Sequence, residues 1–296
     1  MIEVEHISKK FGDFLVLDDI SFRAKEGEIY GLIGYNGVGK TTLMKIISGI
    51  YRPDAGSIRM DGKPVYENAD AKKQCFFMTE EATYFSQASL VQMRKFYRGY
   101  YENWSDQTFE GLIRLFGVDP NMKISRFSKG MQRQASLVLA FSTHSRYLFL
   151  DEAFDGLDFT MRRTMREMLV YYARTQNALL LVSSHNLKEL EDLADTIGML
   201  SEGKLVFDDT TEHMRSSSCT CRFTVTEEAD LSCLEAKLLE EEEDGYMCIL
   251  ECSMEEARER LIQAGAENIR IRPIQLEEFF RKERKEKHIE WKEIFG

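Results

Sequence analysis

LIGYNGVGKTTLMKIISG, residues 32–49, is the stretch that decides the fold. It contains the pattern G-x-x-x-x-G-K-[ST] between Gly34 and Thr41. The apolar residues just before the pattern predict a buried strand, and apolar residues at helical spacing after it predict a helix that ends near Gly49. A strand, a glycine-rich turn and a helix in this order indicate a phosphate-binding loop. A chance match in an ordinary glycine turn is disfavoured because both flanking elements are present.

Each part of this loop has a role in holding a phosphate chain. The glycines let successive backbone N–H groups turn toward phosphate oxygens. Lys40 reaches the β and γ phosphates, and the Thr41 hydroxyl is a ligand for Mg²⁺. The positive end of the following helix adds to this attraction. The predicted nucleotide-binding residues of the loop are Gly34, Tyr35, Asn36, Gly37, Val38, Gly39, Lys40, Thr41 and Thr42.

A second short stretch, YLFLDE at residues 147–152, has four apolar residues followed by two carboxylates. It predicts a buried strand whose carboxyl end carries Asp151 and Glu152, at the edge where parallel sheets bind ligands. We expect Asp151 to hold Mg²⁺, mostly through water, and Glu152 to act as general base toward the attacking water. Because an Asp-Glu pair after a strand is common, this interpretation depends on the phosphate loop upstream.

The stretch RFSKGMQRQ, residues 126–134, lies between these two motifs. Its FSKGM segment resembles the signature sequence of ATP-binding cassette (ABC) proteins, which is usually L-S-G-G-Q. The resemblance implies that Ser128 and the Gly130 amide, at a helix N-terminus, form a second phosphate site that completes the ATP site of a partner subunit. The loop at Gly34 would then hold half of a site. ATP and Mg²⁺ are the implied cofactors, and a homodimer or heterodimer of ATPase subunits is the implied working unit.

Further residues match the family pattern in chain order. Phe11 lies where an aromatic ring stacks on adenine in the family, although Phe14 competes for that role and an ordinary strand-edge aromatic is the alternative. The DGLD sequence ends in Asp158, which in the family contacts the opposite subunit. His185 follows the predicted strand LLLVSS and resembles the histidine that contacts the γ-phosphate, so we expect it to take part in catalysis.

Three features depart from the family pattern. Glu80, followed by Glu81, stands where the family normally has glutamine; a carboxylate can ligate Mg²⁺ but cannot donate a hydrogen bond to water. Lys129 and Met131 replace the common glycine and glutamine of the signature. The frequent Pro-Thr after Glu152 is missing. Because the lysine, both carboxylates and the histidine are retained, we expect a working ATPase.

The resemblance covers residues 1–208, about two thirds of the chain. It implies an α/β fold, a P-loop NTPase core of the ABC ATPase type with an antiparallel β subdomain and a helical subdomain at about 82–145. Alternating strands and helices agree with a parallel sheet. Residues 209–296 are expected to form a small C-terminal α/β accessory domain. Its predicted elements are strands at 219–226, 245–253 and 268–273, and helices at 231–243, 254–266 and 275–288.

Composition excludes several classes of protein. The formal net charge of −11 lacks the basic footprint of a nucleic-acid-binding protein, so no nucleic acid is expected as a partner. No apolar run approaches the roughly 18–20 residues that cross a bilayer, and the N-terminus lacks the apolar core of a signal peptide. We therefore expect a cytoplasmic protein. If it drives transport, it must work peripherally on the inner face of the membrane, bound to a separate integral-membrane permease.

The six cysteines point to no chemistry of their own. Disulfides are not expected in a reducing cytosol. Four of them could together hold a metal, but their spacing is not that of a zinc knuckle and no histidine lies near. We favour small hydrophobic side chains on alternating strands. These four are Cys219, Cys221, Cys248 and Cys252.

The motor subunit of a membrane transporter is the favoured function. The aromatic-rich stretch from Tyr84 to Trp104 lies where the family's helical subdomain receives a permease helix. The side chains of Tyr97, Tyr100, Tyr101 and Trp104 cannot all enter one small core, so part of them are expected as interface anchors. The alternative is a buried helical core with scattered exposed tyrosines. The cargo and the role of the C-terminal domain cannot be read from the sequence.

Soluble ABC ATPases are the competing class. The DNA-repair branch inserts long coiled coils between the two ATP motifs, whereas this chain has one compact helical stretch there. Ribosome-associated members usually carry two cassettes, and this chain has one. Among transporters, the SKGM signature, Glu80 and the small C-terminal domain resemble bacterial exporter subunits that handle drugs, antibiotic peptides or lipid-like cargo. An importer subunit remains an alternative, although importers often carry a β-barrel regulatory domain that is not predicted here.

Overall fold

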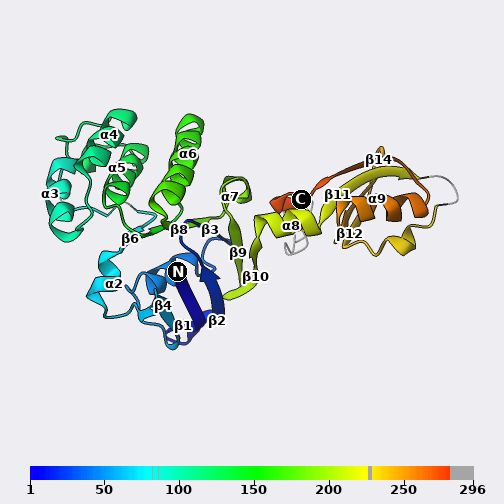
Figure 1. Cartoon of the computed structure of the whole chain (residues 1–296), viewed down its shortest axis with the longest axis horizontal. Helices are drawn as coiled ribbons and strands as arrows, with labels where there is room; N and C mark the ends of the chain where they lie inside the picture. Colours follow the sequence, from blue (N-terminus) through cyan, green and yellow to red (C-terminus); the bar gives the residue numbers. More distant parts are fainter. Residues whose placement is uncertain (82, 86, 226–228, 281–296) are drawn as a thin grey trace, which may run out of the picture. The chain divides into compact units, whose positions relative to one another are not determined.

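The computed structural model describes residues 1–81, 83–85, 87–225 and 229–280 (Figure 1). The chain divides into two compact units, Met1–Asp209 and a second unit that begins at Thr210. Among the described residues, no helix combines the length and apolar character required to span a membrane.

The central layer of the first unit is a six-stranded sheet with strand order β10-β9-β3-β8-β7-β6. Strand β3 pairs in parallel with β8 and β9, and β7 pairs in parallel with β6 and β8. Strands β3, β7 and β8 are buried along their whole length, as expected for strands covered on both faces. The predicted α/β fold is therefore confirmed. The strands are β3 (Ile29–Ile33), β6 (Cys75–Met78), β7 (Tyr147–Leu150), β8 (Leu179–Ser184), β9 (Thr196–Ser201) and β10 (Lys204–Thr210).

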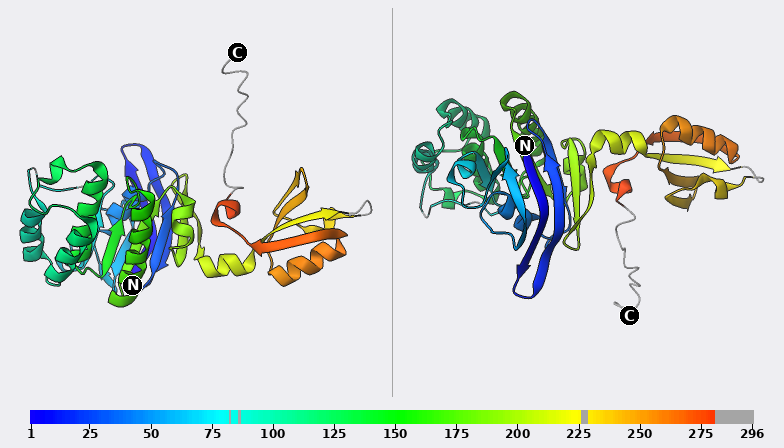
Figure 2. Two further views of the ribbon diagram at one scale, coloured as in Figure 1. Left: turned by 90° about the horizontal axis from the view of Figure 1, so that it is seen from above. Right: turned by 60° about the horizontal axis from the view of Figure 1, so that its bottom comes forward.

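A smaller antiparallel sheet, of order β2-β1-β4-β5, is visible in blue in Figure 2. Its strands are β1 (Ile2–Phe11), β2 (Phe14–Ala24), β4 (Ala55–Met60) and β5 (Lys63–Pro64). Helix α1 (Lys40–Ile47) shares one hydrophobic core with both sheets, because Leu43 and Met44 pack in the same cluster as Ile20 of β2 and Phe149 of β7. This shared core fixes the start of α1 against the carboxyl ends of the parallel strands.

Helices make up the rest of the first unit. In Figure 1, α3 (Leu90–Tyr100), α4 (Asp106–Phe116) and α5 (Lys129–Ser142) gather together, with α6 (Phe159–Gln176) beside them. Helices α3, α4 and α5 each begin after a serine N-cap; at α4 this is Ser105, which accepts a hydrogen bond from the Thr108 N–H at 3.1 Å. The shorter helices are α2 (Ala69–Lys73), the 3₁₀ turn η1 (Ile124–Arg126) and α7 (Leu187–Glu191).

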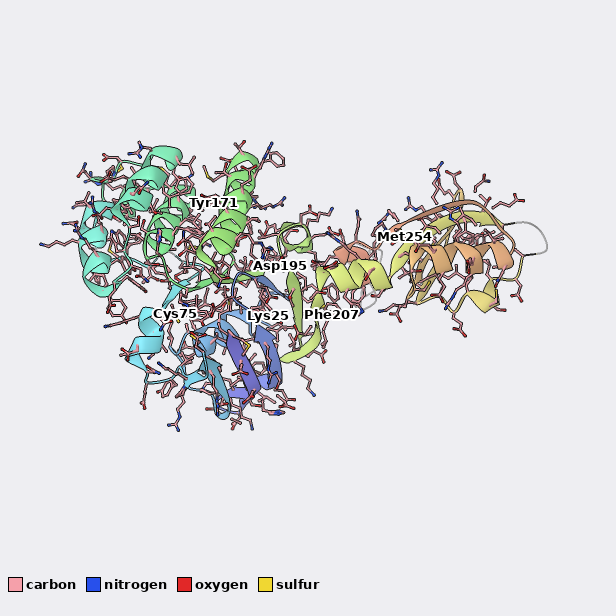
Figure 3. All side chains as sticks on the ribbon, viewed as in Figure 1. Lys25, Cys75, Tyr171, Asp195, Phe207 and Met254 are labelled. Carbon is pink, nitrogen blue, oxygen red and sulfur yellow. The ribbon has the colours of Figure 1, made fainter. Side chains whose placement is uncertain are left out.

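The second unit contains a four-stranded antiparallel sheet of order β12-β13-β11-β14, with α9 along one face (Figure 2). Cys219, Cys221, Cys248 and Cys252 are buried in its core, as predicted. Cys75 is buried at the start of β6 and is labelled in Figure 3. The elements are α8 (Thr211–Ser217), β11 (Cys219–Val225), η2 (Leu231–Leu234), β12 (Leu238–Glu242), β13 (Gly245–Leu250), α9 (Met254–Gln263), β14 (Ala266–Pro273) and α10 (Leu276–Phe279).

The predicted helix at 231–243 is wrong. The chain forms the short 3₁₀ turn η2 and then strand β12, in which Glu242 pairs with Gly245 across a tight hairpin. Glutamate and leucine favour a helix locally, but pairing with β13 and the Asp244-Gly245 turn signal override that preference. The five consecutive acidic residues 240–244 therefore belong to an edge strand and its turn. The predicted helix at 275–288 is described only as α10, and its remainder lies outside the described residues.

Candidate functional site

The glycine loop between β3 and α1 has the geometry of a phosphate cradle. Gly37 and Gly39 adopt φ angles of 81° and 111°, which L side chains rarely adopt. A Cβ on Gly39 would also lie 2.8 Å from the side chain of Leu17, and one on Gly34 would lie 2.7 Å from the Leu200 carbonyl oxygen. The loop conformation therefore requires glycine at these positions.

Lys40 is buried at the start of α1, and its Nζ donates hydrogen bonds to the carbonyl oxygens of Gly34 at 2.6 Å and Tyr35 at 3.3 Å. The same nitrogen lies 3.0 Å from Oε1 of Glu152. The ammonium group is thus held over the centre of the loop, where phosphate oxygens would replace these partners.

Thr41 and Asp151 meet across the sheet edge. The Thr41 hydroxyl donates to Oδ2 of Asp151 at 2.6 Å, and the Ser183 hydroxyl donates to Oδ1 at 2.6 Å. Asp151 is fully buried at the end of β7. A hydroxyl and a carboxylate oxygen supplied by two rigid elements form the kind of oxygen donor pair that Mg²⁺ prefers, so these residues fit the predicted metal.

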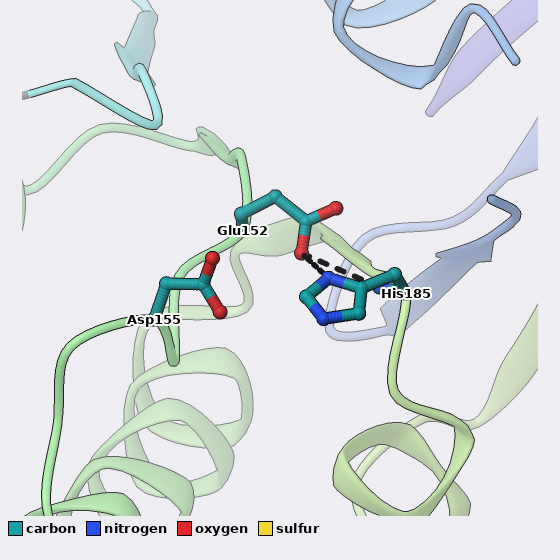
Figure 4. A group of neighbouring side chains, drawn as sticks. All are labelled: Glu152, Asp155 and His185. Atoms are coloured by element: carbon teal, nitrogen blue, oxygen red, sulfur yellow. Dashed lines mark hydrogen bonds and ion pairs between the residues drawn. The ribbon is translucent and has the colours of Figure 1, made fainter. Parts of the chain in front are cut away.

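Glu152 follows Asp151 and is held from both ends. Its backbone has a φ of 45°, an uncommon conformation for a residue with a side chain, and its N–H donates to the Ser183 hydroxyl at 2.9 Å. Its Oε2 lies 2.9 Å from Nδ1 of His185 and accepts the backbone N–H of His185 at 3.3 Å (Figure 4). The structure therefore brings together Lys40, Glu152 and His185, the three residues that the sequence suggests for catalysis.

A cavity of about 370 Å³ opens beside this group. Phe11 lines it, with its side chain 48% exposed, whereas Phe14 is 70% exposed and does not. This favours Phe11 over Phe14 as the aromatic residue available to stack on a nucleotide base. Glu80 borders the same cavity as Glu152. The lining residues are Phe11, Val16, Tyr35, Asn36, Gly37, Gly39, Lys40, Thr41, Thr42, Glu80 and Glu152.

The signature residues do not line the cavity beside the phosphate loop. Ser128 is exposed and caps α5, accepting the Met131 N–H at 3.3 Å. A Cβ on Gly130 would lie 2.9 Å from the Gly156 carbonyl oxygen, so the signature turn packs closely on the loop that precedes Asp158. That loop ends where Asp158 accepts the Met161 N–H at 2.8 Å and begins α6. Ser128, Gly130 and Asp158 therefore lie together outside the cavity that the phosphate loop lines.

A larger cavity of about 620 Å³ adjoins the start of α5. Its walls come from the segment after β6, from α5 and from the loop after Glu152. Glu80 is the residue common to both cavities. The lining residues are Glu80, Glu81, Tyr84, Lys129, Gln132, Arg133, Asp155 and Gly156.

Two residues at the site were not predicted. Ser183 bridges the side chain of Asp151 and the backbone of Glu152, and the polar end of the apolar strand LLLVSS could have signalled it. Arg133 is 5% exposed and donates to the carbonyl oxygens of Thr79 and Glu152. The corresponding signal for Arg133 is that it is the one charged residue among the mostly apolar buried positions of helix α5.

Comparison with known proteins gives concordant results. The family model described as ABC transporter matches residues 17–155. The chain is 30% identical over 226 residues to the Nod factor export ATP-binding protein I of Burkholderia lata, covering 74% of each chain. It is 29% identical over 205 residues to the ABC transporter ATP-binding protein YtrB of Bacillus subtilis, covering 69% of this chain and 70% of that one.

Solved structures agree with the sequence relatives. A structure described as the ATP-binding subunit of an ABC transporter is 27% identical, with a TM-score of 0.66, and covers 73% of this chain and 92% of that one. The matched share of this chain corresponds in extent to the first compact unit.

Proposed function

The chain belongs to the ABC transporter family of ATPases, and we propose that it powers export through a separate integral-membrane permease. The observation that carries the ATPase part is the meeting of Lys40, Glu152 and His185 beside the glycine loop. Export is favoured because a relative named for Nod factor export matches about three quarters of this chain. The proposed cargo class is a drug, an antibiotic peptide or a lipid-like molecule.

The proposed reaction begins with ATP in the cavity lined by Phe11 and the glycine loop. Loop N–H groups and Lys40 hold the phosphates, so Lys40 must exchange its Glu152 partner for a phosphate oxygen. Thr41 and Asp151 are the residues that would hold Mg²⁺, with Glu80 as a further carboxylate at the same cavity. Bound Mg²⁺ would neutralise charge that develops on the phosphates.

Glu152 then has the position of a general base. Once Lys40 leaves Oε1, that oxygen is free to accept a proton from the attacking water, while His185 continues to hold Oε2. Because the Glu152 side chain is buried, bulk solvent does not compete with the attacking water and His185 for its carboxylate. The side chain of His185 is more exposed, at 45%, and is proposed to contact the terminal phosphate.

The active unit is proposed to be a dimer. Ser128 and Gly130 lie at a helix N-terminus outside the cavity that holds the phosphate loop of the same chain. A second copy, or a related chain, would supply its signature turn to each ATP, and Asp158 would lie at the same contact. ATP binding would close the pair, and hydrolysis followed by phosphate release would reopen it.

Exposed aromatic rings on and before α3 are the proposed permease contact. Phe85 and Phe96 are 52% and 49% exposed, with ring centroids 4.8 Å apart, and Tyr100 is 42% exposed. Tyr97 is half-buried and stacks on Trp104. Large aromatic side chains left partly exposed in a group are characteristic of protein interfaces.

Tyr101 departs from the predicted set of anchors. It is buried, and its hydroxyl donates to the carbonyl oxygen of Cys75 at 2.9 Å. It therefore ties α3 to strand β6 and is not available to a partner.

The test is co-expression with the membrane protein encoded nearest to this chain, followed by purification in detergent and reconstitution into vesicles. The proposal expects the two to co-purify and the vesicles to move cargo away from the side that carries the ATPase. Phe96→Glu should abolish co-purification, and Leu115→Glu, an exposed apolar residue on α4, is the matched control. Cargo movement toward the ATPase side would identify an importer. ATPase activity stimulated by DNA or ribosomes, without a membrane partner, would identify the soluble class.

A further inference from the structure

Arg133 lies on α5, five residues after the N-cap Ser128, and its side chain is 5% exposed. Its guanidinium group joins two segments that are far apart in the sequence. Nη1 donates to the Thr79 carbonyl oxygen at 2.9 Å, and Nη2 donates to the Glu152 carbonyl oxygen at 3.0 Å. One planar group therefore spans from the residue before Glu80 to the residue proposed as general base.

The surroundings of Arg133 are acidic. Burial lowers the pKa of the guanidinium group, and the nearby carboxylates of Asp155, Asp151, Glu80 and Glu152 oppose that change. An arginine stays charged in proteins, so a full positive charge is buried here. Such a charge requires both partners and geometry to offset its desolvation, and an apolar side chain of similar volume would avoid the cost altogether. The hydrogen bonds to two carbonyl oxygens are what the arginine provides here and an apolar side chain could not.

The Glu152 backbone is the more informative of the two contacts. Its φ of 45° is an unfavourable conformation for a residue with a side chain, and it persists only where the surroundings enforce it. The Ser183 hydroxyl holds the N–H, while Arg133 and the Asp155 N–H, at 3.1 Å, hold the carbonyl oxygen. Because a side chain leaves the backbone in a direction that φ determines, these contacts also aim the Glu152 carboxylate.

We propose that Arg133 is a positioning residue for ATP hydrolysis, which couples the placement of helix α5 to the direction of the Glu152 carboxylate. Ser128 caps the same helix, so nucleotide held at the signature turn by a partner subunit would act on Glu152 through one rigid element. The contact with Thr79 extends this coupling to the segment that carries Glu80. This inference rests on the proposed role of Glu152 as general base.

The test compares Arg133→Met and Arg133→Lys with Gln134→Ala, a change at the next, half-buried position of the same helix. In Arg133→Met we expect kcat to fall about 10- to 100-fold while KM for ATP stays within about twofold, because the base is misplaced and the phosphate loop is intact. Arg133→Lys keeps the charge, but one ammonium group cannot span both carbonyls. The kcat of Arg133→Lys should therefore lie between those of wild type and Arg133→Met, and at least about threefold below wild type. Gln134→Ala should match wild type.

Repeating the change in the Glu152→Gln background separates positioning from a structural role. With no base left to aim, Arg133→Met should alter the residual single-turnover rate by less than about twofold. A repeated loss of the size seen with Glu152 present would overturn the inference, as would wild-type kcat in Arg133→Lys or an effect confined to KM. Binding of a fluorescent ATP analogue, with the wild-type affinity, shows that each variant is folded. Unchanged hydrolysis in the single variant Glu152→Gln, with Arg133 retained, would instead contradict the proposed role of Glu152.

Discussion

Nζ of Lys40 lies 3.0 Å from Oε1 of Glu152, and both side chains are buried. The residue proposed to hold phosphate is thus paired with the residue proposed to activate water. In the proposed reaction, phosphate oxygens and the Glu152 carboxylate would compete for one ammonium group, so ATP binding and release of the base would be a single exchange. This relationship sets the direction of the first two predictions.

Glu152→Gln should bind ATP at least as tightly as wild type, because the amide competes less well than a carboxylate for Lys40. Hydrolysis should fall by about 100- to 10,000-fold, the usual contribution of a general base. Equilibrium binding of a fluorescent ATP analogue and single-turnover assays measure the two effects separately. Weaker ATP binding would contradict the competition between Glu152 and phosphate, and rapid turnover would remove Glu152 from the role of base.

Lys40→Ala should lose nucleotide binding, because the charge over the loop is removed and Glu152 is left without its buried partner. The matched control is Lys45→Ala, on the same helix, where the ammonium group lies over the Tyr51 ring at 5.4 Å. Isothermal titration with Mg·ATP should show no binding for the first variant and wild-type affinity for the second. Unchanged affinity in Lys40→Ala would exclude the loop as the phosphate site.

Much of the fold was predictable because local signals and tertiary packing agree in the first unit. The strand before Gly34, the helix after it and the cap at Ser105 each follow from a local pattern that the core then reinforces. Strand β12 shows the opposite case. Its Leu and Glu residues favour a helix, and only the pairing of the whole segment with β13, from Leu238 opposite Ile249 to Glu242 opposite Gly245, makes it a strand. A pairing between segments is not encoded in either segment alone.

The site divides in the same way. Lys40, Glu152 and His185 could be named because each occupies a fixed place in a recognisable motif. Ser183 and Arg133 could not, because they act through backbone groups of other segments. The polar end of the strand LLLVSS and the charged residue on a buried helix face each signal a buried polar contact, but neither signal identifies the partner group in another segment.

Asp208→Asn should raise the midpoint of urea unfolding at pH 7. The Tyr30 hydroxyl donates to Oδ1 of Asp208 at 2.7 Å, and burial, together with the charges of Glu28 and Asp209, raises the pKa of Asp208. Asparagine keeps the acceptor oxygen and removes the disfavoured charge. Because the folded-state pKa exceeds the unfolded one, wild type gains stability relative to the variant as the pH falls through that raised value. The difference between the two should therefore shrink in acid, and a difference that grows would refute the assignment.

The six thiols should divide into one reactive group and five protected groups. Cys233 is exposed, whereas the other five are buried, and burial raises the pKa of the Cys252 thiol to about 11. Since the thiolate is the reactive form, an aromatic disulfide reagent at pH 8 should label one cysteine quickly in the folded protein and all six in denaturant. Cys233→Ser should remove the fast phase. Fast labelling that persists in this variant would show that one of the five buried cysteines, either Cys75 or one of the four in the second unit, is accessible.

Mixing two inactive variants tests whether each ATP site is shared between subunits. Lys40→Ala destroys the phosphate loop but keeps the signature turn, and Ser128→Arg does the reverse by placing a bulky side chain at the start of α5. In a mixed dimer, the intact loop of one chain would face the intact turn of the other, so one of the two sites is complete. Random exchange in an equal mixture of copies should restore about a quarter of wild-type hydrolysis. Doubling the concentration of either variant alone is the control and should restore nothing.

If the mixture stays inactive while each variant folds and Ser128→Arg still binds ATP, then either the site lies within one chain or the partner is a different subunit. Adding a related ATPase subunit to each variant separates these two outcomes. A partner of another type would complete one of the two ATP sites with either variant, whereas a site within one chain would add nothing to the activity of that subunit alone.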